Sequence, residues 1–202
     1  VVDVAQKDQM TAFSEEVCQA LGTPHILVNN AGVAVGSKVQ HMALDDWDWI
    51  LGINIRGVIH GIHTFLPRMV AQGEGGHIIN IASAFAYTSG SMTSAYAATK
   101  HFVLGLSRGL RLELEGSNIG VSAICPGIIN TNITHDARTM GIDKPKEMRQ
   151  FMINLFSKTG APPERVARAI VRAIRKNRPM VLVGKEAYLV YFLSRFFPWL
   201  LP

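Results

Sequence analysis

The chain has 202 residues, which is the length of one domain with a sizeable buried core. Its 48% of hydrophobic and 17% of charged residues exclude an intrinsically disordered protein. The net charge of +5 is mild for this length, so no nucleic-acid partner is expected.

The first part of the chain alternates predicted strands and helices. Residues 1–4 are expected to form the end of a strand, and residues 8–21 an amphipathic helix closed by Gly22. A short buried strand at 25–29 then runs into Asn30-Ala31-Gly32. This alternation predicts an α/β fold with a doubly wound parallel sheet, and a glycine-bearing turn after a strand is where a cofactor would lie.

A second helix is predicted to begin at Asp45 and Asp46, because acidic residues in the first turn are stabilised by the helix dipole. Its apolar positions recur as far as Phe65, with a break in the pattern at Asn54 and Gly57. A buried amide in such a helix needs hydrogen-bond partners. Asn54 is therefore either an internally bonded structural residue or part of a site.

The centre of the chain holds the residues with the clearest chemistry. An apolar run at 77–83 predicts a buried strand that ends on Ser83, at the strand end where open α/β sheets bind ligands. Helical periodicity from Tyr96 to Glu115 places Tyr96 and Lys100 one turn apart on one face. An ammonium about 4 Å from a phenol in a partly buried site favours the phenolate by roughly 4 kcal/mol. Unless the pair is an ordinary surface contact, we expect Lys100 to lower the pKa of Tyr96 by about three units.

The remaining elements are less regular. A strand is predicted at 120–125 before a Pro-Gly turn, a helix opens at 162–163, and a last strand is expected at 179–183. The pattern is weak over 130–160, and a long connection of this kind is usually functional, so we expect a substrate lid there. Its apolar residues would contact a greasy substrate or belong to the core; they are Ile133, Met140, Ile142, Met148, Phe151, Met152, Leu155 and Phe156.

The C-terminal tail, 187–202, is apolar and aromatic, with Arg195 as its only charged residue. It is too short to span a bilayer, and no run of about 18 apolar residues occurs elsewhere. Packing against a second subunit or capping of the substrate pocket is the favoured interpretation. Peripheral membrane contact, next to the arginines between 165 and 175, is the alternative.

Cysteine usage indicates the compartment. Cys18 and Cys125 are far apart, without a CxxC motif or a Cys/His cluster, so neither a disulfide framework nor a metal site is expected. A reducing, cytoplasmic location fits best.

Ser83 followed by Tyr96-Ala97-Ala98-Thr99-Lys100 is similar to the catalytic signature of the short-chain dehydrogenase/reductase family. The likeness covers residues 1–202, as one Rossmann-like domain. The resemblance implies an oxidoreductase that uses NAD or NADP on an alcohol or carbonyl compound, and it implies a homo-oligomer.

The resemblance also assigns site residues. The implied catalytic set is Asn54, Ser83, Tyr96 and Lys100. The implied cofactor-binding set is Asp3, Val4, Asn30, Ala31, Gly32, Tyr96, Lys100, Pro126, Gly127, Ile129 and Thr131. In the family, Asp3 and Val4 would lie against the adenine ring, and Ile129 and Thr131 would hold the nicotinamide carboxamide. Asn54 would bend its helix and hold a water that relays protons, while Asn29 would mainly hold the central sheet.

One family feature is missing from these residues. Neither G-x-G-x-x-G nor T-G-x-x-x-G-x-G occurs, although backbone N–H groups of such a turn hold the cofactor pyrophosphate. We expect either a preceding segment on the order of 60 residues or a protein that has lost its cofactor site. The residue that separates NAD from NADP would lie in that segment, so the choice cannot be read.

The favoured hypothesis is hydride transfer between a nicotinamide cofactor and a small apolar alcohol or carbonyl substrate. The alternative is a noncatalytic relative that serves as a dimerising or membrane-associated binding module. An epimerase or dehydratase of the extended relatives is a weaker option.

Overall fold

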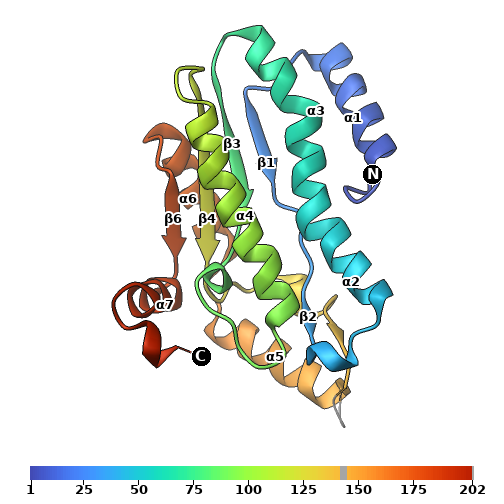
Figure 1. The fold of residues 1–202 in the computed structure, drawn as a ribbon, viewed down its shortest axis with the longest axis vertical. Coiled ribbons are helices and arrows are strands. Elements are labelled where there is room, and N and C mark those ends of the chain that lie inside the picture. Colours follow the sequence, from blue (N-terminus) through green and yellow to red (C-terminus); the bar gives the residue numbers. More distant parts are fainter. Residues whose placement is uncertain (142–144, 202) are drawn as a thin grey trace.

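Four parallel strands form the central sheet in the computed structural model, which describes residues 1–141 and 145–201 (Figure 1). The strand order is β1-β3-β4-β6, and each adjacent pair is parallel. The bounds are Ile26–Asn29, Gly76–Ile81, Ile119–Pro126 and Met180–Val183. The predicted α/β fold with a parallel sheet is confirmed.

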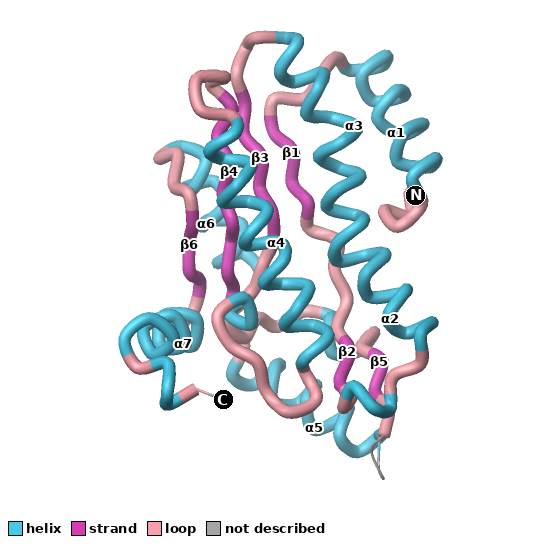
Figure 2. Tube along the Cα trace, viewed as in Figure 1, coloured by secondary structure: helices cyan, strands magenta, loops and turns pink. Residues whose placement is uncertain are grey.

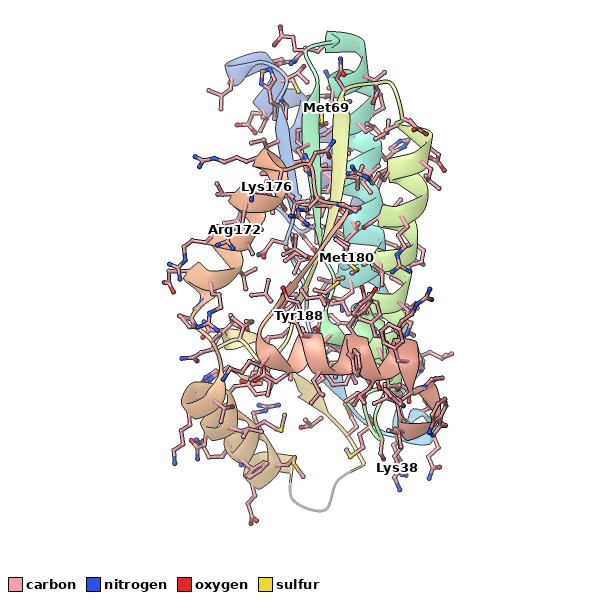
Figure 3. All side chains as sticks on the ribbon, turned by 90° about the vertical axis from the view of Figure 1, so that its left-hand side faces the viewer. Lys38, Met69, Arg172, Lys176, Met180 and Tyr188 are labelled. Carbon is pink, nitrogen blue, oxygen red and sulfur yellow. The ribbon has the colours of Figure 1, made fainter. Side chains whose placement is uncertain are left out.

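Helices cover both faces of this sheet. Figure 3 shows the sheet from its β6 edge, with α6 (Pro163–Arg175) on one side and α3 (Gly57–Gln72) and α4 (Ser94–Glu113) on the other. The helix α1 (Lys7–Leu21) packs on α3. Because the inner strands are covered on both faces, β3 and β4 consist of nearly continuous buried residues, as their sequences predict.

A chain of polar side chains crosses the layer between sheet and helices. Asn29 on β1 donates its amide to Asn80 Oδ1 on β3 at 2.8 Å, and Asn80 donates to Ser107 Oγ on α4 at 3.0 Å. Ser107 in turn donates to the carbonyl of Val103 at 2.6 Å. These bonds give partners to the buried Asn80 amide and the half-buried Asn29 amide, and they fix β1, β3 and α4 relative to one another.

The predicted helix from Asp45 to Phe65 consists of three parts. The helix α2 (Leu44–Leu51) and α3 are joined by a π-helical segment, Gly52–Arg56, which contains Asn54. The break in the apolar pattern therefore marks a real irregularity, because a π-turn inserts an extra residue into the helical repeat.

The prediction of a strand end at residues 1–4 is wrong. Val4 and Ala5 form a turn, with the amide of Gln6 bonded to the carbonyl of Asp3 at 3.1 Å. A strand needs a neighbour for its backbone bonds, and no strand among the described residues pairs with the outer edge of β1.

The region 130–160 is more regular than its sequence pattern indicates. It contains the helix α5 (Pro145–Thr159) and the short strand β5 (Arg138–Thr139), which pairs with β2 (Val35–Gly36). Figure 2 shows β2 and β5 side by side, away from the main sheet and next to α5. Of the apolar residues predicted to form the lid, Ile142 lies outside the described residues.

The C-terminal tail forms the helix α7 (Lys185–Phe196) and a 3₁₀ turn, Pro198–Leu200. Within residues 1–141 and 145–201, no helix combines the length and apolar character needed to cross a bilayer.

Candidate active site

A cleft of about 990 Å³ opens beyond the carboxyl ends of β3 and β4. Ends of strands, the first turns of α4, and residues of α5, α6 and α7 form its walls. The cleft contains most of the site residues predicted from sequence: Asn30, Ala31, Gly32, Ser83, Tyr96, Lys100, Pro126, Gly127, Ile129 and Thr131. This is the position where parallel α/β sheets bind ligands.

Ser83 lies two residues beyond the end of β3. Its backbone is extended and it caps the 3₁₀ turn Ala84–Ala86, with its hydroxyl accepting the amide of Phe85 at 3.2 Å. This bond fixes the hydroxyl oxygen at the strand end, where it lines the cleft.

Tyr96 and Lys100 lie one turn apart at the start of α4, as predicted. The Lys100 Nζ is 5.6 Å from the centre of the Tyr96 ring and donates to the carbonyl of Ile81 at 3.0 Å. The ring of Phe85 meets the Tyr96 ring edge-on, with centroids 5.7 Å apart. Ser83, Tyr96 and Lys100 therefore lie at one end of one cleft.

The predicted lowering of the Tyr96 pKa is wrong for this structure. Burial raises the pKa of the phenol, and the hydrogen bond with Ser83 opposes that rise. Burial also lowers the pKa of the Lys100 ammonium to about 8, partly offset by the nearby Cys125. The prediction from sequence considered only the attraction between the two groups. It left out burial, which disfavours the charged form of each group.

Asn54 lies behind the cleft and is 1% exposed. Its Oδ1 accepts the amide of Val33 at 2.8 Å, and its Nδ2 donates to the carbonyl of Val33 at 2.9 Å and to Thr99 Oγ1 at 3.0 Å. The side chain thus ties the π-helical segment to α4 and to the loop after β1. This is the internally bonded arrangement, and a proton relay through Asn54 stays a prediction.

The loop after β1 approaches Lys100 closely. A side chain at Gly32 would begin 3.4 Å from Lys100 Nζ and 3.5 Å from Asn54 Oδ1. A methyl group at Gly32 would thus be in van der Waals contact with the ammonium and with the Asn54 amide.

Asp3 and Val4 lie apart from this cleft. Val4 lines a second cavity of about 680 Å³ along β1, which shares Asn30 and Ala31 with the cleft. The Val4 carbonyl accepts from His60 Nδ1 at 2.8 Å. Val4 thus lines a cavity that adjoins the cleft at Asn30 and Ala31. Within the residues described, Asp3 borders neither cavity.

Several cleft residues were not among the predicted site residues, including Glu186 at the start of α7 and Met92 in the turn before α4. Val190 also lines the cleft, and it belongs to the C-terminal tail that was expected to cap the substrate pocket or pack against a second subunit. Met92 has φ of 72°, a left-handed conformation uncommon for a residue with a side chain. Its carbonyl accepts the amide of Ser37 at 2.8 Å. Gly90 indicates a turn in the sequence, but the sequence gives no sign that Met92 is the residue of this turn with a left-handed backbone.

Comparison with known proteins agrees with this geometry. The family model described as short chain dehydrogenase matches residues 1–141. The chain belongs to the short-chain dehydrogenase family. The resemblance inferred from Ser83, Tyr96 and Lys100 is thereby confirmed.

Several relatives of this short-chain dehydrogenase chain carry oxidoreductase names. "Probable oxidoreductase EphD" of Mycobacterium tuberculosis is 37% identical over 98% of this chain and 34% of its own length. "C alpha-dehydrogenase" of a Sphingobium species is 33% identical over 92% of this chain and 63% of its own length. The chain thus spans about a third of the mycobacterial relative and less than two thirds of the Sphingobium one.

Solved structures of the family superpose closely. A short-chain dehydrogenase/reductase from Burkholderia phymatum, in complex with NAD, has a TM-score of 0.87 at 27% identity, over 96% of this chain and 72% of that one. The apo form of LigD from Sphingobium has a TM-score of 0.77 at 29% identity, over 99% of this chain and 72% of that one.

Proposed function

We propose that this chain carries the catalytic part of an NAD(P)-dependent oxidoreductase that interconverts an alcohol and a carbonyl compound. The observation that supports this most is the convergence of Ser83, Tyr96 and Lys100 at one end of the cleft. The names of the relatives and the NAD complex of a family member point the same way.

Each of the three side chains has a role in this proposal. Tyr96 donates its proton to the carbonyl oxygen of the substrate, and Ser83 donates a hydrogen bond to the same oxygen. Because burial raises the pKa of Tyr96, the phenol carries the proton that reduction requires. Lys100 supplies a positive charge beside the phenol, and Asn54 holds α4 and the neighbouring loop in register.

The residues present fit the nicotinamide half of the cofactor. Lys100 is 4% exposed and borders the cleft, and the carbonyl of Ile81 accepts from one of the three N–H groups of its ammonium. The other N–H groups suit the two hydroxyls of a ribose. When bound, the nicotinamide supplies or accepts the hydride. Ile129 and Thr131 would contact its carboxamide, and Asp3 and Val4 its adenine.

The substrate in this proposal is a small apolar alcohol or carbonyl compound. The α5 residues that border the cleft are Met148, Arg149, Met152 and Phe156, and Ile133 precedes them. Apolar and flexible side chains of this kind accommodate greasy ligands. We propose that residues 130–160 act as the substrate lid. Phe151 is exposed and lies outside this lining.

The test is the Tyr96→Phe variant in the natural-length protein, which loses the proton donor but keeps the ring. We expect turnover to fall by about 10²–10⁴-fold, with nicotinamide binding retained. Turnover is followed by nicotinamide absorbance with NADH and NADPH on a panel of apolar aldehydes and ketones, and binding by nicotinamide fluorescence. Tyr188→Phe, on the outer side of α7, is the matched control. Undiminished turnover in Tyr96→Phe would reject the assignment.

A noncatalytic binding module is the second candidate, favoured by the exposed aromatic side chains of α7. It predicts that the natural-length protein binds neither NADH nor NADPH in the same fluorescence titration. Both free cysteines and the proposed redox chemistry suit a cytoplasmic location, which we adopt as part of the proposal.

A further inference from the structure

The lid region meets the body of the protein at the two-stranded pair β2–β5. The amide of Arg138 donates to the carbonyl of Ala34 at 3.2 Å, and the amide of Met140 donates to the carbonyl of Gly36 at 3.3 Å. Strands of two residues are far below the length of an independently stable pair. Something besides these bonds must hold β5 in place.

The Arg138 side chain supplies that attachment. Its Nη1 lies 2.9 Å from Asp46 Oδ1, and its guanidinium carbon lies 4.0 Å from the centre of the Trp49 ring. Asp46 and Trp49 are three residues apart on α2 and therefore share one face of that helix. A guanidinium can stack on an aromatic face while it bonds a carboxylate, which an ammonium does less well.

The lid is connected to this attachment. Ala137 and Thr139, on either side of Arg138, both line the cleft. The carbonyl of Ala137 accepts from Arg149 Nη2 at 3.0 Å, which links β5 to the helix α5. Fastening Arg138 to α2 therefore holds β5, and with it α5, against the cleft.

Two elements hold β5, namely its partner strand β2 and the helix α2, and both are connected to Asn54. The helix α2 continues into the π-helical segment that contains Asn54, and β2 begins two residues after Val33, the backbone partner of Asn54. Figures 1 and 2 show β2 and β5 between the ends of α2 and α5. The attachment thus joins the lid to the elements that carry Asn54.

We propose that Arg138 is a positioning residue that holds the substrate lid over the cleft through Asp46 and Trp49. The role in turnover rests on the proposed oxidoreductase function; the attachment itself does not. Loss of the guanidinium frees β5 and weakens substrate binding, while the cofactor side of the cleft is unchanged.

Hydrogen exchange tests the attachment without any need for activity. Arg138→Met in the natural-length protein keeps much of the side chain but removes the guanidinium. We expect the amides at positions 138 and 140 to exchange at least tenfold faster, with unchanged exchange in β3 and β4. Arg172→Met, at an exposed arginine on α6, is the control (Figure 3). Equal exchange at 138 and 140 in the wild type and Arg138→Met would overturn the proposal.

Steady-state kinetics test the consequence for the substrate. Arg138→Met and Asp46→Asn should each raise KM for the carbonyl substrate about tenfold, with kcat and cofactor affinity changed less than twofold. The double variant should resemble Arg138→Met, because Arg138→Met already removes the ion pair that Asp46→Asn also removes. Asp45→Asn, in the same helical turn but exposed, is the matched control. Additive effects, or a loss in kcat alone, would contradict the proposal.

The outcomes also separate the two proposals. Faster exchange at positions 138 and 140 in a protein that shows no turnover would retain the attachment and reject the oxidoreductase function. Unchanged exchange at these positions in an active protein would retain the oxidoreductase function and reject the attachment.

Discussion

Burial raises the pKa of Tyr96 and lowers the pKa of Lys100. Both shifts favour the uncharged form of the side chain. Because its pKa is raised above the ordinary value, the phenol holds its proton at neutral pH. The ammonium loses its charge as the pH rises through about 8. In the proposed reduction, a protonated Tyr96 beside a charged Lys100 is the productive state.

This pair of shifts predicts the pH dependence of carbonyl reduction. Well below a Lys100 pKa of about 8 both groups are protonated, so kcat/KM should be flat from pH 6 to about pH 7. Above that pH, Lys100 is increasingly neutral, and kcat/KM should fall toward tenfold for each further pH unit. A pH profile from 6 to 10 measures this, with Lys176→Met, at an exposed lysine just after α6, as a control that keeps the same profile. A profile that rises through pH 9 would show that the charge of Lys100 is not required.

The positions of site residues could be predicted from sequence where they depend on the local secondary structure. Helical spacing places Tyr96 and Lys100 together, and an apolar run that ends on Ser83 places its hydroxyl at the sheet edge. The pKa values were not predictable, because they depend on Phe85 and other distant segments that exclude water from the phenol. Asp3 and Val4 were assigned by resemblance alone, and the structure places them outside the cleft.

Among the elements, the polar bridge Asn29–Asn80–Ser107 carries a stability prediction. Asn80 is fully buried and is the central member, so Asn80→Ala leaves both the Asn29 amide and the Ser107 hydroxyl with one partner fewer. We expect a loss of about 1–3 kcal/mol in the free energy of unfolding.

Urea unfolding of the natural-length protein, followed by circular dichroism, measures this loss. Asn154→Ala, at an exposed asparagine on α5, should change the free energy by less than about 0.5 kcal/mol. Equal midpoints for the two variants would mean that the bridge contributes no net stability.

The sequence predicts long elements better than short ones. β3 and β4 are runs of buried apolar residues, and the apolar face of α1 recurs at helical spacing, so each is visible in the residues themselves. The strands β2 and β5 have two residues each and exist because distant segments meet, with Arg138 bound to α2. The π-helical turn at Asn54 shows in the sequence as a break in the apolar pattern, but the bonds of Asn54 to Val33 and Thr99 join distant segments and could not be predicted.

At the scale of the whole molecule, the outer face of α7 carries large exposed aromatic side chains. Its inner face packs on the core through the buried Ala187, and Tyr191 meets Tyr87 edge-on. Its outer face exposes Tyr188, Phe192 and Phe196, which are four residues apart in sequence and so form one stripe. Contiguous exposed aromatic side chains of this kind mark an interaction surface.

We predict that a second copy of the protein covers this stripe, since a two-fold axis would pair it with itself. Phe192 is 50% exposed at its centre, so Phe192→Ser should raise the dimer dissociation constant at least tenfold without unfolding the protein. Sedimentation over a range of concentrations measures this, with Val171→Ser, at a 48% exposed position on α6, as a matched control. If wild type and Phe192→Ser sediment identically as monomers, the second copy is excluded.

Binding to phosphatidylglycerol vesicles that Phe192→Ser weakens would then assign the stripe to a membrane surface, where the arginines of α6 would meet anionic headgroups.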